Sequence, residues 1–198
     1  MNTNKNIGLY FGTFNPIHIG HLNIANYMVE FSDLDEIWMV VTPHNPHKKK
    51  KTLLDDIHRL AMVRIALEEY PKLKASNIEF GMEQPNYTVN TLAHLEEKYP
   101  ENNFCLIMGE DNLKSFHKWK NYQVILERYK IYVYPRISKV TAENQKIDAS
   151  HKAITKVSAP VMELSSTFIR KAIKEGKNIR PMLPEAVWKY LDEMNFYK

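Results

Sequence analysis

Apolar and polar positions follow two periods along this chain, one typical of buried strands and one typical of amphipathic helices. Short apolar runs predict strands at residues 7–11, 36–41, 77–80, 104–108, 130–134 and 156–162. Apolar residues spaced three or four apart predict helices at residues 19–31, 55–65, 89–99, 123–127 and 166–175, with a final helix from residue 184.

Residues with strong positional preferences mark the ends of several predicted helices. Asp55 and Asp56 place negative charge at a helix N-terminus, where the helix dipole favours it. Ser166 is the predicted N-cap of the next-to-last helix, Gly176 lies at its C-terminal end, and Pro184 opens the final helix. Between residues 136 and 154 the periodicity is weak, which predicts an irregular excursion.

The order of these elements indicates the class of fold. Strands that alternate with helices from the first residues onward predict an α/β fold, in which helices cover both faces of a parallel sheet. A C-terminal helical segment follows the last predicted strand. The chain has 198 residues without an internal repeat or linker, so residues 1–198 are expected to form a single domain. Ligands of such sheets bind at the carboxyl ends of the strands.

Composition narrows the classes of protein further. Hydrophobic residues make up 44% of the chain and charged residues 25%, as in an ordinary soluble globular protein. The polar N-terminus and the lack of a long apolar stretch predict a cytoplasmic protein without membrane contact. Cys105 is the only cysteine, so a disulfide within the chain is excluded. Its apolar neighbours favour a buried strand thiol over a nucleophile.

Charge is almost balanced, so its distribution is more informative than its total. The chain carries 27 basic and 23 acidic side chains, a formal net charge of +4. The basic excess is concentrated at residues 47–51 and 170–180, which indicates local anion sites. The alternative for the lysine run is an ordinary solvated loop.

The segment GTFNPIHIGH, residues 12–21, joins the first predicted strand to the first predicted helix. Gly12 permits close backbone approach, Pro16 rigidifies the turn, and Gly20 leaves room in the first helical turn. His18 and His21 can share one helix face, and His21 is expected to point back toward the free amide groups of the helix N-terminus. The spacing is not that of a zinc site, so phosphate is favoured and no residue is assigned to a metal.

A second anion site is predicted at residues 165–170. Ser166 begins a helix and Arg170 follows one turn later, so a hydroxyl, free amides and a guanidinium can surround one anion. The alternative is an ordinary helix cap with an arginine that faces solvent. The first phosphate-type turn favours the anion site.

The segment 12–21 resembles the HxGH signature of the nucleotidyltransferase superfamily, which consists of Rossmann-like enzymes that transfer a nucleotidyl group from a nucleoside triphosphate. Further segments resemble, in order, the motifs of bacterial nicotinate-mononucleotide adenylyltransferases: NYTVNTL at 86–92, GED at 109–111 with Trp119 eight residues later, and SSTFIR at 165–170. The resemblance spans nearly the whole chain. Phe11 and Asn15 depart from it, because the family often has Gly and Asp there.

The resemblance implies an adenylyltransferase of NAD biosynthesis that joins ATP to nicotinate mononucleotide and releases pyrophosphate. The implied catalytic residues are His18, His21 and Arg170. The implied contacts to ATP and its phosphates are Gly12, Thr13, Phe14, Lys48, Gly109, Asp111 and Ser166, with Arg59 as a weaker candidate. The implied contacts to nicotinate mononucleotide are Tyr87, Thr88 and Trp119. In this scheme the tryptophan stacks on the nicotinate ring, and the backbone near residues 87–88 reads its carboxylate.

The residue types favour direct transfer without a covalent intermediate. No serine or cysteine nucleophile paired with a base is apparent, and the ionised 5′-phosphate of a nucleotide can attack the α-phosphorus of ATP in line. Mg²⁺, held mainly by phosphate oxygens and water, is the expected cofactor. The resemblance places Asp111 where it could assist the hydrated ion.

Two alternative functions follow from the same residues. One is an adenylyl- or cytidylyltransferase that acts on another phosphate acceptor, either nicotinamide mononucleotide or phosphopantetheine. The other is a noncatalytic nucleotide or RNA sensor, suggested by the basic loop and the aromatic residues and disfavoured by the two histidines and the Ser/Arg pair. The expected partners are therefore ATP and nicotinate mononucleotide, with no nucleic acid and no membrane. A homo-oligomer is compatible with the sequence.

Overall fold

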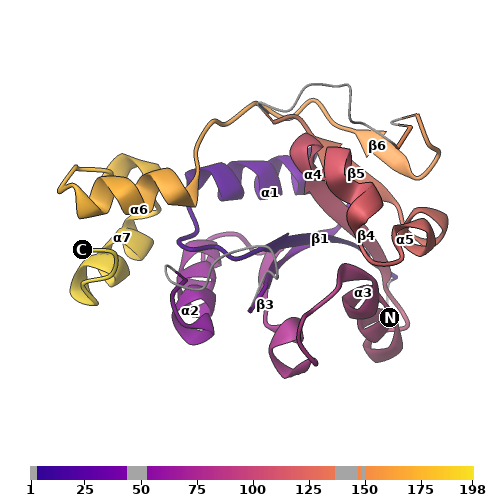
Figure 1. Ribbon diagram of the computed structural model, residues 1–198, viewed down its shortest axis with the longest axis horizontal. Coiled ribbons are helices and arrows are strands. Elements are labelled where there is room, and N and C mark those ends of the chain that lie inside the picture. Colours follow the sequence, from indigo (N-terminus) through magenta and orange to yellow (C-terminus); the bar gives the residue numbers. More distant parts are fainter. Residues whose placement is uncertain (1–3, 44–52, 137–146, 149) are drawn as a thin grey trace.

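A six-stranded parallel sheet forms the centre of the computed structural model, which describes residues 4–43, 53–136, 147–148 and 150–198 (Figure 1). The strand order is β3-β2-β1-β4-β5-β6, and every neighbouring pair is parallel. The strands are β1 (Asn6–Gly12), β2 (Glu36–Val41), β3 (Leu73–Ser76), β4 (Asn103–Gly109), β5 (Ile131–Tyr134) and β6 (Ile154–Lys156). The predicted α/β fold with a parallel sheet is confirmed.

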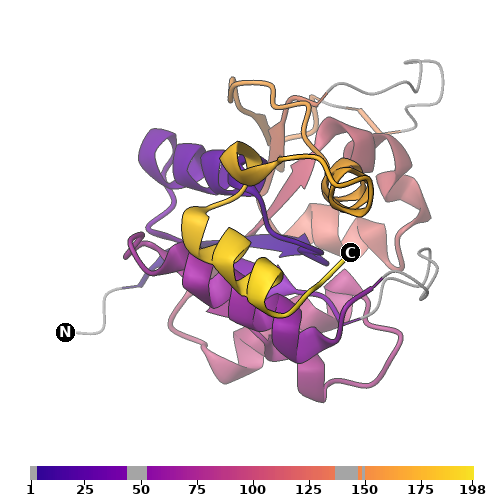
Figure 2. The same cartoon turned by 90° about the vertical axis from the view of Figure 1, so that its left-hand side faces the viewer.

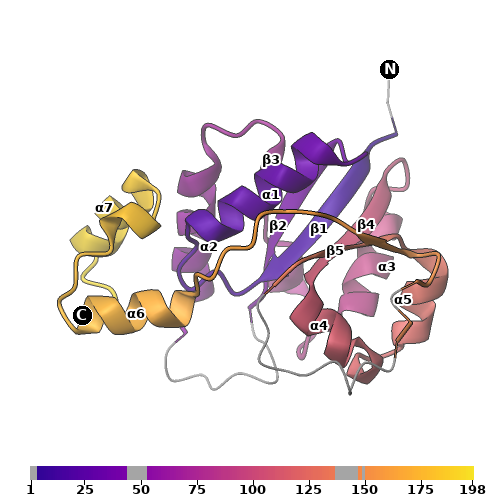
Figure 3. The ribbon, with the colours of Figure 1, turned by 90° about the horizontal axis from the view of Figure 1, so that it is seen from above.

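Helices connect consecutive strands from β1 to β5, and two more follow β6. The α-helices are α1 (Ile19–Phe31), α2 (Asp56–Leu67), α3 (Thr88–Lys98), α4 (Glu110–Ser115), α5 (Tyr122–Arg128), α6 (Ser166–Lys174) and α7 (Glu185–Glu193). Short 3₁₀ helices are η2 (Ile78–Gly81), η3 (Phe116–Lys118) and η5 (Arg180–Met182). The chain leaves β1 toward β2 and later returns to β4 on the other side of β1 (Figure 3). In sheets of this kind, ligands bind at the carboxyl ends of the strands where the strand order reverses, which here are β1 and β4.

Each face of the sheet has its own apolar core. On β1, Tyr10 belongs to a cluster that includes buried residues of α1, α2, α6 and α7. Ile7 and Leu9 of the same strand belong to a second cluster, shared with α3, α4 and α5. Successive strand residues point to opposite faces, so the near-continuous apolar run of β1 is buried on both sides. The prediction that helices cover both faces is confirmed.

Two predicted strands differ from the structure. Residues 77–80 do not form a strand, because β3 ends at Ser76 and the chain turns into η2, with the Ser76 hydroxyl accepting the N–H of Ile78 at 3.4 Å. The last strand was predicted at residues 156–162 and spans only Ile154–Lys156. Its partner β5 ends before Pro135, and Pro160 has no N–H to donate to a ladder.

The C-terminal helical segment lies at the opposite end of the molecule from β6 (Figure 1). Figure 2 shows α7 running alongside α2. Gly176 adopts φ +67° just after α6, and Pro184 directly precedes α7, as predicted. The predicted N-cap is wrong by one residue. Ser165 caps α6, with its Oγ accepting the N–H of Phe168 at 3.2 Å, and Ser166 is the first helical residue.

Within the described ranges, none of the helices combines the length and the apolar character that spanning a membrane requires.

Cys105 is buried in β4, and this burial raises the pKa of its thiol to about 11. A thiol with this pKa is protonated at neutral pH, which agrees with the predicted structural role.

The close contact of β1 with its neighbours yields a stability prediction. A Cβ added at Gly8 would lie 2.6 Å from Ile107 Cδ1 and 2.8 Å from both Ile37 Cδ1 and Leu34 Cδ1. Gly8→Ala should therefore overpack the core and lower the free energy of unfolding by about 1–3 kcal/mol, measured by urea denaturation. Gly81→Ala is the matched control, because a Cβ there meets nothing within 4 Å. Equal stability of the two variants would contradict the prediction.

Candidate active site

The turn between β1 and α1 holds the first predicted site residues. Phe14 adopts φ 43°, and its side chain is only 1% exposed. The ring packs edge-on against Tyr10 and His21, with centroids 5.9 Å and 5.1 Å away. A Cβ at Gly12 would lie 2.9 Å from Phe14 Cζ. The side chain of Phe14 is therefore part of the core, and only its main chain is left for a nucleotide contact.

The two histidines of the HxGH segment lie against each other. Their rings stack with centroids 3.7 Å apart and an interplanar angle of 26°. The backbone N–H of His18, which precedes the first residue of α1, donates to Nδ1 of His21 at 3.3 Å. An accepting Nδ1 leaves the proton of a neutral imidazole on Nε2. His21 therefore carries its donor on the nitrogen farther from the backbone.

His18 is the more buried of the pair, with 3% exposure. Burial, with a further contribution from the positive charge of Arg136, lowers the pKa of His18 to about 4. Its Nδ1 has no hydrogen-bond partner among the described residues. His18 is therefore an uncharged imidazole at neutral pH. It can orient neighbours or form hydrogen bonds, but it supplies no positive charge.

The N-terminal part of α6 is bonded to the same turn. The hydroxyl of Ser166 donates to the carbonyl oxygen of Pro16 at 2.8 Å. Nη1 of Arg170 donates to the carbonyl oxygen of Asn15 at 2.7 Å, and Nη2 donates to Thr167 Oγ1 at 3.3 Å. The two segments for which the sequence predicts anion binding, about 150 residues apart, are in contact.

The end of β4 supplies the next predicted residues. Gly109 ends the strand, and Asp111 lies in the first turn of α4. The Oδ2 atom of Asp111 is 3.4 Å from Nη1 of Arg136, whereas its buried Oδ1 has no hydrogen-bond partner among the described residues. A Cβ at Gly109 would lie 2.5 Å from this Oδ1, so a larger residue there would displace the carboxylate. In the part of the chain that the structure describes, no group of three or more His, Cys, Asp or Glu residues could hold a metal ion.

The residues predicted for nicotinate mononucleotide occupy a neighbouring part of this edge. Tyr87 has an extended backbone and directly precedes α3, and Thr88 is the first residue of this helix. Nζ of Lys120 lies 4.4 Å from the centre of the Tyr87 ring, which places the loop after η3 beside α3. Trp119 in this loop is half-buried and packs edge-on against Phe116 at 5.2 Å. Tyr87, Thr88 and Trp119 therefore border the same region.

A buried carboxyl group behind Tyr87 was missed by the sequence analysis. Glu79 is 2% exposed, and burial raises its pKa. Thr91 Oγ1 donates to its Oε1 at 2.7 Å, and Asn86 Nδ2 donates to its backbone carbonyl at 3.1 Å. These bonds fix the loop that leads to α3. The available signal was one acidic residue between the apolar Ile78 and Phe80.

Arg59 does not have the phosphate-binding role for which it was considered. Its side chain is fully buried, and its five N–H groups are used within the protein. They donate to the carbonyl oxygens of Leu54, Thr13, Thr42 and Pro43 and to the carboxylate of Asp56. Arg59 is thus a structural residue that holds the turn and the end of β2. Lys48, the other basic candidate, lies outside the described residues.

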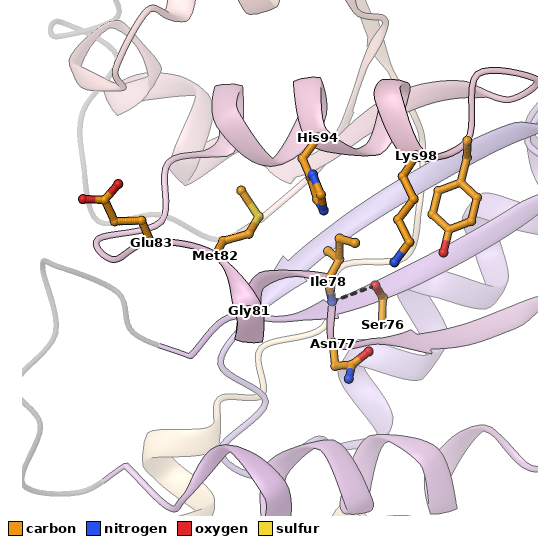
Figure 4. A pocket seen from close by; sticks show the side chains of 9 residues that line it. Ser76, Asn77, Ile78, Gly81, Met82, Glu83, His94 and Lys98 are labelled. Atoms are coloured by element: carbon orange, nitrogen blue, oxygen red, sulfur yellow. Dashed lines mark hydrogen bonds between the residues drawn. The ribbon is translucent and has the colours of Figure 1, made fainter.

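A hollow of about 550 Å³ lies between η2 and α3, away from the predicted site residues (Figure 4). Its lining residues are Ser76, Asn77, Ile78, Gly81, Met82, Glu83, His94, Lys98 and Tyr99. None of them carries a role in the predicted site. The candidate active site is therefore the carboxyl edge of the sheet, from the 12–18 turn to Trp119.

Comparisons with known proteins agree with this fold and identify the family. The model of the family described as cytidylyltransferase-like matches residues 9–172. A protein of Christiangramia forsetii, named "Probable nicotinate-nucleotide adenylyltransferase", is 68% identical over 98% of this chain and 100% of its own. A protein of the same name from Flavobacterium psychrophilum is 66% identical over 97% and 98% of the two chains.

A solved structure, Plasmodium falciparum nicotinic acid mononucleotide adenylyltransferase complexed with APC, shares the fold with a TM-score of 0.75. It is 21% identical, over 98% of this chain and 97% of that one. The chain belongs to the cytidylyltransferase-like family and is a nucleotidyltransferase. Within that family, its identity to the bacterial relatives places it among the nicotinate-nucleotide adenylyltransferases.

The burial of His18 makes a prediction about stability and pH. Its pKa is about 4 in the folded protein and about 6.5 when unfolded, so its stabilising contribution is complete above pH 6.5 and is lost as the pH falls toward 4. This loss should reach about 3 kcal/mol in the wild type. His18→Gln cannot take up this proton, so the stability gap between wild type and variant should shrink over this range. Urea denaturation at pH 7, 6, 5 and 4 measures it, and a constant gap would contradict the prediction.

Proposed function

We propose that this chain transfers the adenylyl group of ATP to nicotinate mononucleotide, giving nicotinate adenine dinucleotide and pyrophosphate in NAD biosynthesis. The contact between α6 and the 12–18 turn carries this proposal, since it gathers His21, Ser166 and Arg170 at the carboxyl edge of the sheet. The names of the bacterial relatives support the choice of acceptor.

In the proposed reaction, the 5′-phosphate of nicotinate mononucleotide attacks the α-phosphorus of ATP. A new P–O bond forms to this phosphorus while the bond to the β-phosphate oxygen breaks, and pyrophosphate leaves with the electron pair. The attacking phosphate is already ionised at neutral pH, so a general base is not required. Catalysis then consists of aligning the two nucleotides and stabilising the charge that builds on the transferred group.

The residues of the turn and of α6 would share this task. Nε2–H of His21 would donate to an oxygen of the transferred phosphate, because its Nδ1 is held by the backbone of His18. Arg170 uses one N–H on Asn15 and one on Thr167 and has further donors for the phosphates of ATP. The backbone N–H groups of Gly12, Thr13 and Phe14 and that of Ser166, the first residue of α6, would complete the phosphate contacts, because the Ser166 hydroxyl already donates to Pro16. Gly109 and Asp111 would border the nucleotide at the end of β4, and Lys48 remains a candidate outside the described residues.

The α3 side of the edge would bind the pyridine nucleotide. The first turn of α3 contains no acidic residue, so its free N–H groups and the helix dipole favour a carboxylate near Tyr87 and Thr88. The exposed part of the Trp119 ring would stack on the nicotinate ring. An acid would thus be recognised mainly by the main chain.

Mg²⁺ fits this site as an ion held mainly by the phosphates of ATP. The described residues offer Asp111 Oδ1, a buried carboxylate oxygen without a partner, as a protein group toward such an ion or its water. One carboxylate together with phosphates and water is a common environment of Mg²⁺. When bound, the ion would supply neutralisation of phosphate charge.

The acceptor can be tested directly by pyrophosphate release. With ATP, we expect turnover with nicotinate mononucleotide and a kcat/KM about tenfold to a hundredfold lower with the amide, since a charge-assisted hydrogen bond is worth about 1.5–3 kcal/mol. Phosphopantetheine should give no release. ATP binding without turnover on any of the three acceptors would contradict the proposal and favour a noncatalytic nucleotide sensor.

His21 should act mainly in the transition state. His21→Ala is expected to lower kcat by about 10²–10³-fold, because a preorganised donor to the reacting phosphate is lost, while KM for either substrate changes less than about threefold. Steady-state kinetics of pyrophosphate release measure both values. His94→Ala is the control, since it removes an imidazole from the hollow next to η2 and should leave kcat unchanged. Unchanged kcat in the His21 variant would exclude this role.

A further inference from the structure

The segment that follows α7 returns to the turn at the start of the chain. The hydroxyl of Tyr197 donates to Oδ1 of Asn15, although the two residues are 182 positions apart. The same Oδ1 accepts the backbone N–H of Leu54 at 3.2 Å. Asn15 is only 4% exposed. Its side-chain oxygen therefore joins three separate segments in the interior, next to the proposed phosphate site.

The main chain of Asn15 is in turn bonded to Arg170. Its carbonyl oxygen accepts Nη1 of Arg170 at 2.7 Å. One residue thus connects Tyr197, through its side chain, with Arg170, through its backbone. Burial raises the pKa of Tyr197, so its hydroxyl remains a donor at neutral pH. The positive charges of Arg170 and Arg59 oppose part of this rise in pKa.

The backbone around Tyr197 adopts conformations that residues with a side chain rarely take. Asn195 has φ 54° and Tyr197 has φ 64°, both in the left-handed region. Between them, Phe196 packs against His58 of α2 at 4.8 Å and against Tyr190 of α7 at 6.1 Å. Such a backbone persists where surrounding contacts fix it. Here these contacts direct the tyrosine toward the turn.

We infer that Tyr197 is a positioning residue for the transfer reaction. Its hydroxyl holds the Asn15 side chain, and the Asn15 carbonyl holds the guanidinium of Arg170 in its orientation toward the phosphates. This inference rests on the proposed function of Arg170. It also explains how Asn15 can stand where the family often has Asp, since the position needs a hydrogen-bond acceptor and not a negative charge.

The test is Tyr197→Phe, which removes only the hydroxyl group. We expect kcat to fall about tenfold, with KM for nicotinate mononucleotide within twofold of wild type, because Arg170 is displaced from the ATP phosphates and not from the acceptor. Tyr190→Phe is the matched control. It removes a neighbouring hydroxyl that is 2.8 Å from His58 Nδ1 and does not contact the turn, so its kcat should stay within twofold of wild type. Asn15→Asp keeps the acceptor and should retain kcat within about threefold.

A double-mutant comparison separates this role from general destabilisation. In an Arg170→Lys background the link from Asn15 to the guanidinium is absent, so Tyr197→Phe should lower kcat by less than twofold. A full tenfold loss in that background, or an unchanged kcat for Tyr197→Phe alone, would overturn the inference. If Arg170→Lys itself leaves kcat unchanged, the proposed function of Arg170 fails. If Arg170→Lys loses activity and Tyr197→Phe does not, the positioning role of Tyr197 fails and the proposed function of Arg170 stands.

Discussion

The carbonyl groups of the turn at residues 13–16 have no partner within the sheet, and the proposed site depends on the side chains that bond to them. A chain that leaves a sheet for a helix presents main-chain oxygens that the ladder cannot pair, and burial would make them costly. Side chains from distant elements satisfy them here. The donors are Arg59, Ser166 and Arg170. Two of the bonds that stabilise the turn therefore also bring α6 to the proposed phosphate site.

Two basic side chains near this turn are buried, and burial leaves one of them uncharged while the other keeps its charge. His18 is buried, its Nδ1 has no partner in the described part of the chain, and the side chain is uncharged at neutral pH. Arg59 is buried as deeply but keeps its charge, because carbonyl oxygens and the carboxylate of Asp56 surround it and arginine does not lose its proton in proteins. His18 therefore supplies no positive charge to the proposed phosphate site, whereas the guanidinium of Arg170 would supply one.

On the α3 side of the proposed site, buried groups likewise hold the residues at the surface in place. Glu79 is buried behind the loop that leads to α3 and holds it through Thr91 and Asn86. Tyr87 and the first N–H groups of α3 are thereby presented from a fixed support. In both halves, buried groups determine where the residues proposed to contact the ligands lie, and such preorganisation is what phosphoryl transfer requires.

The sequence by itself determined the parallel sheet, most helix limits and the two segments that meet at the edge, because hydrophobic period, helix caps and short motifs are local properties. It misplaced the strand at 77–80, and it did not reveal that Phe14 is a core residue or that Arg59 has no donor left. Only the tertiary structure decided these points and the bond from Tyr197 to Asn15. Whether a polar group is free for a ligand depends on which distant residues have already bonded to it, and no local pattern records that.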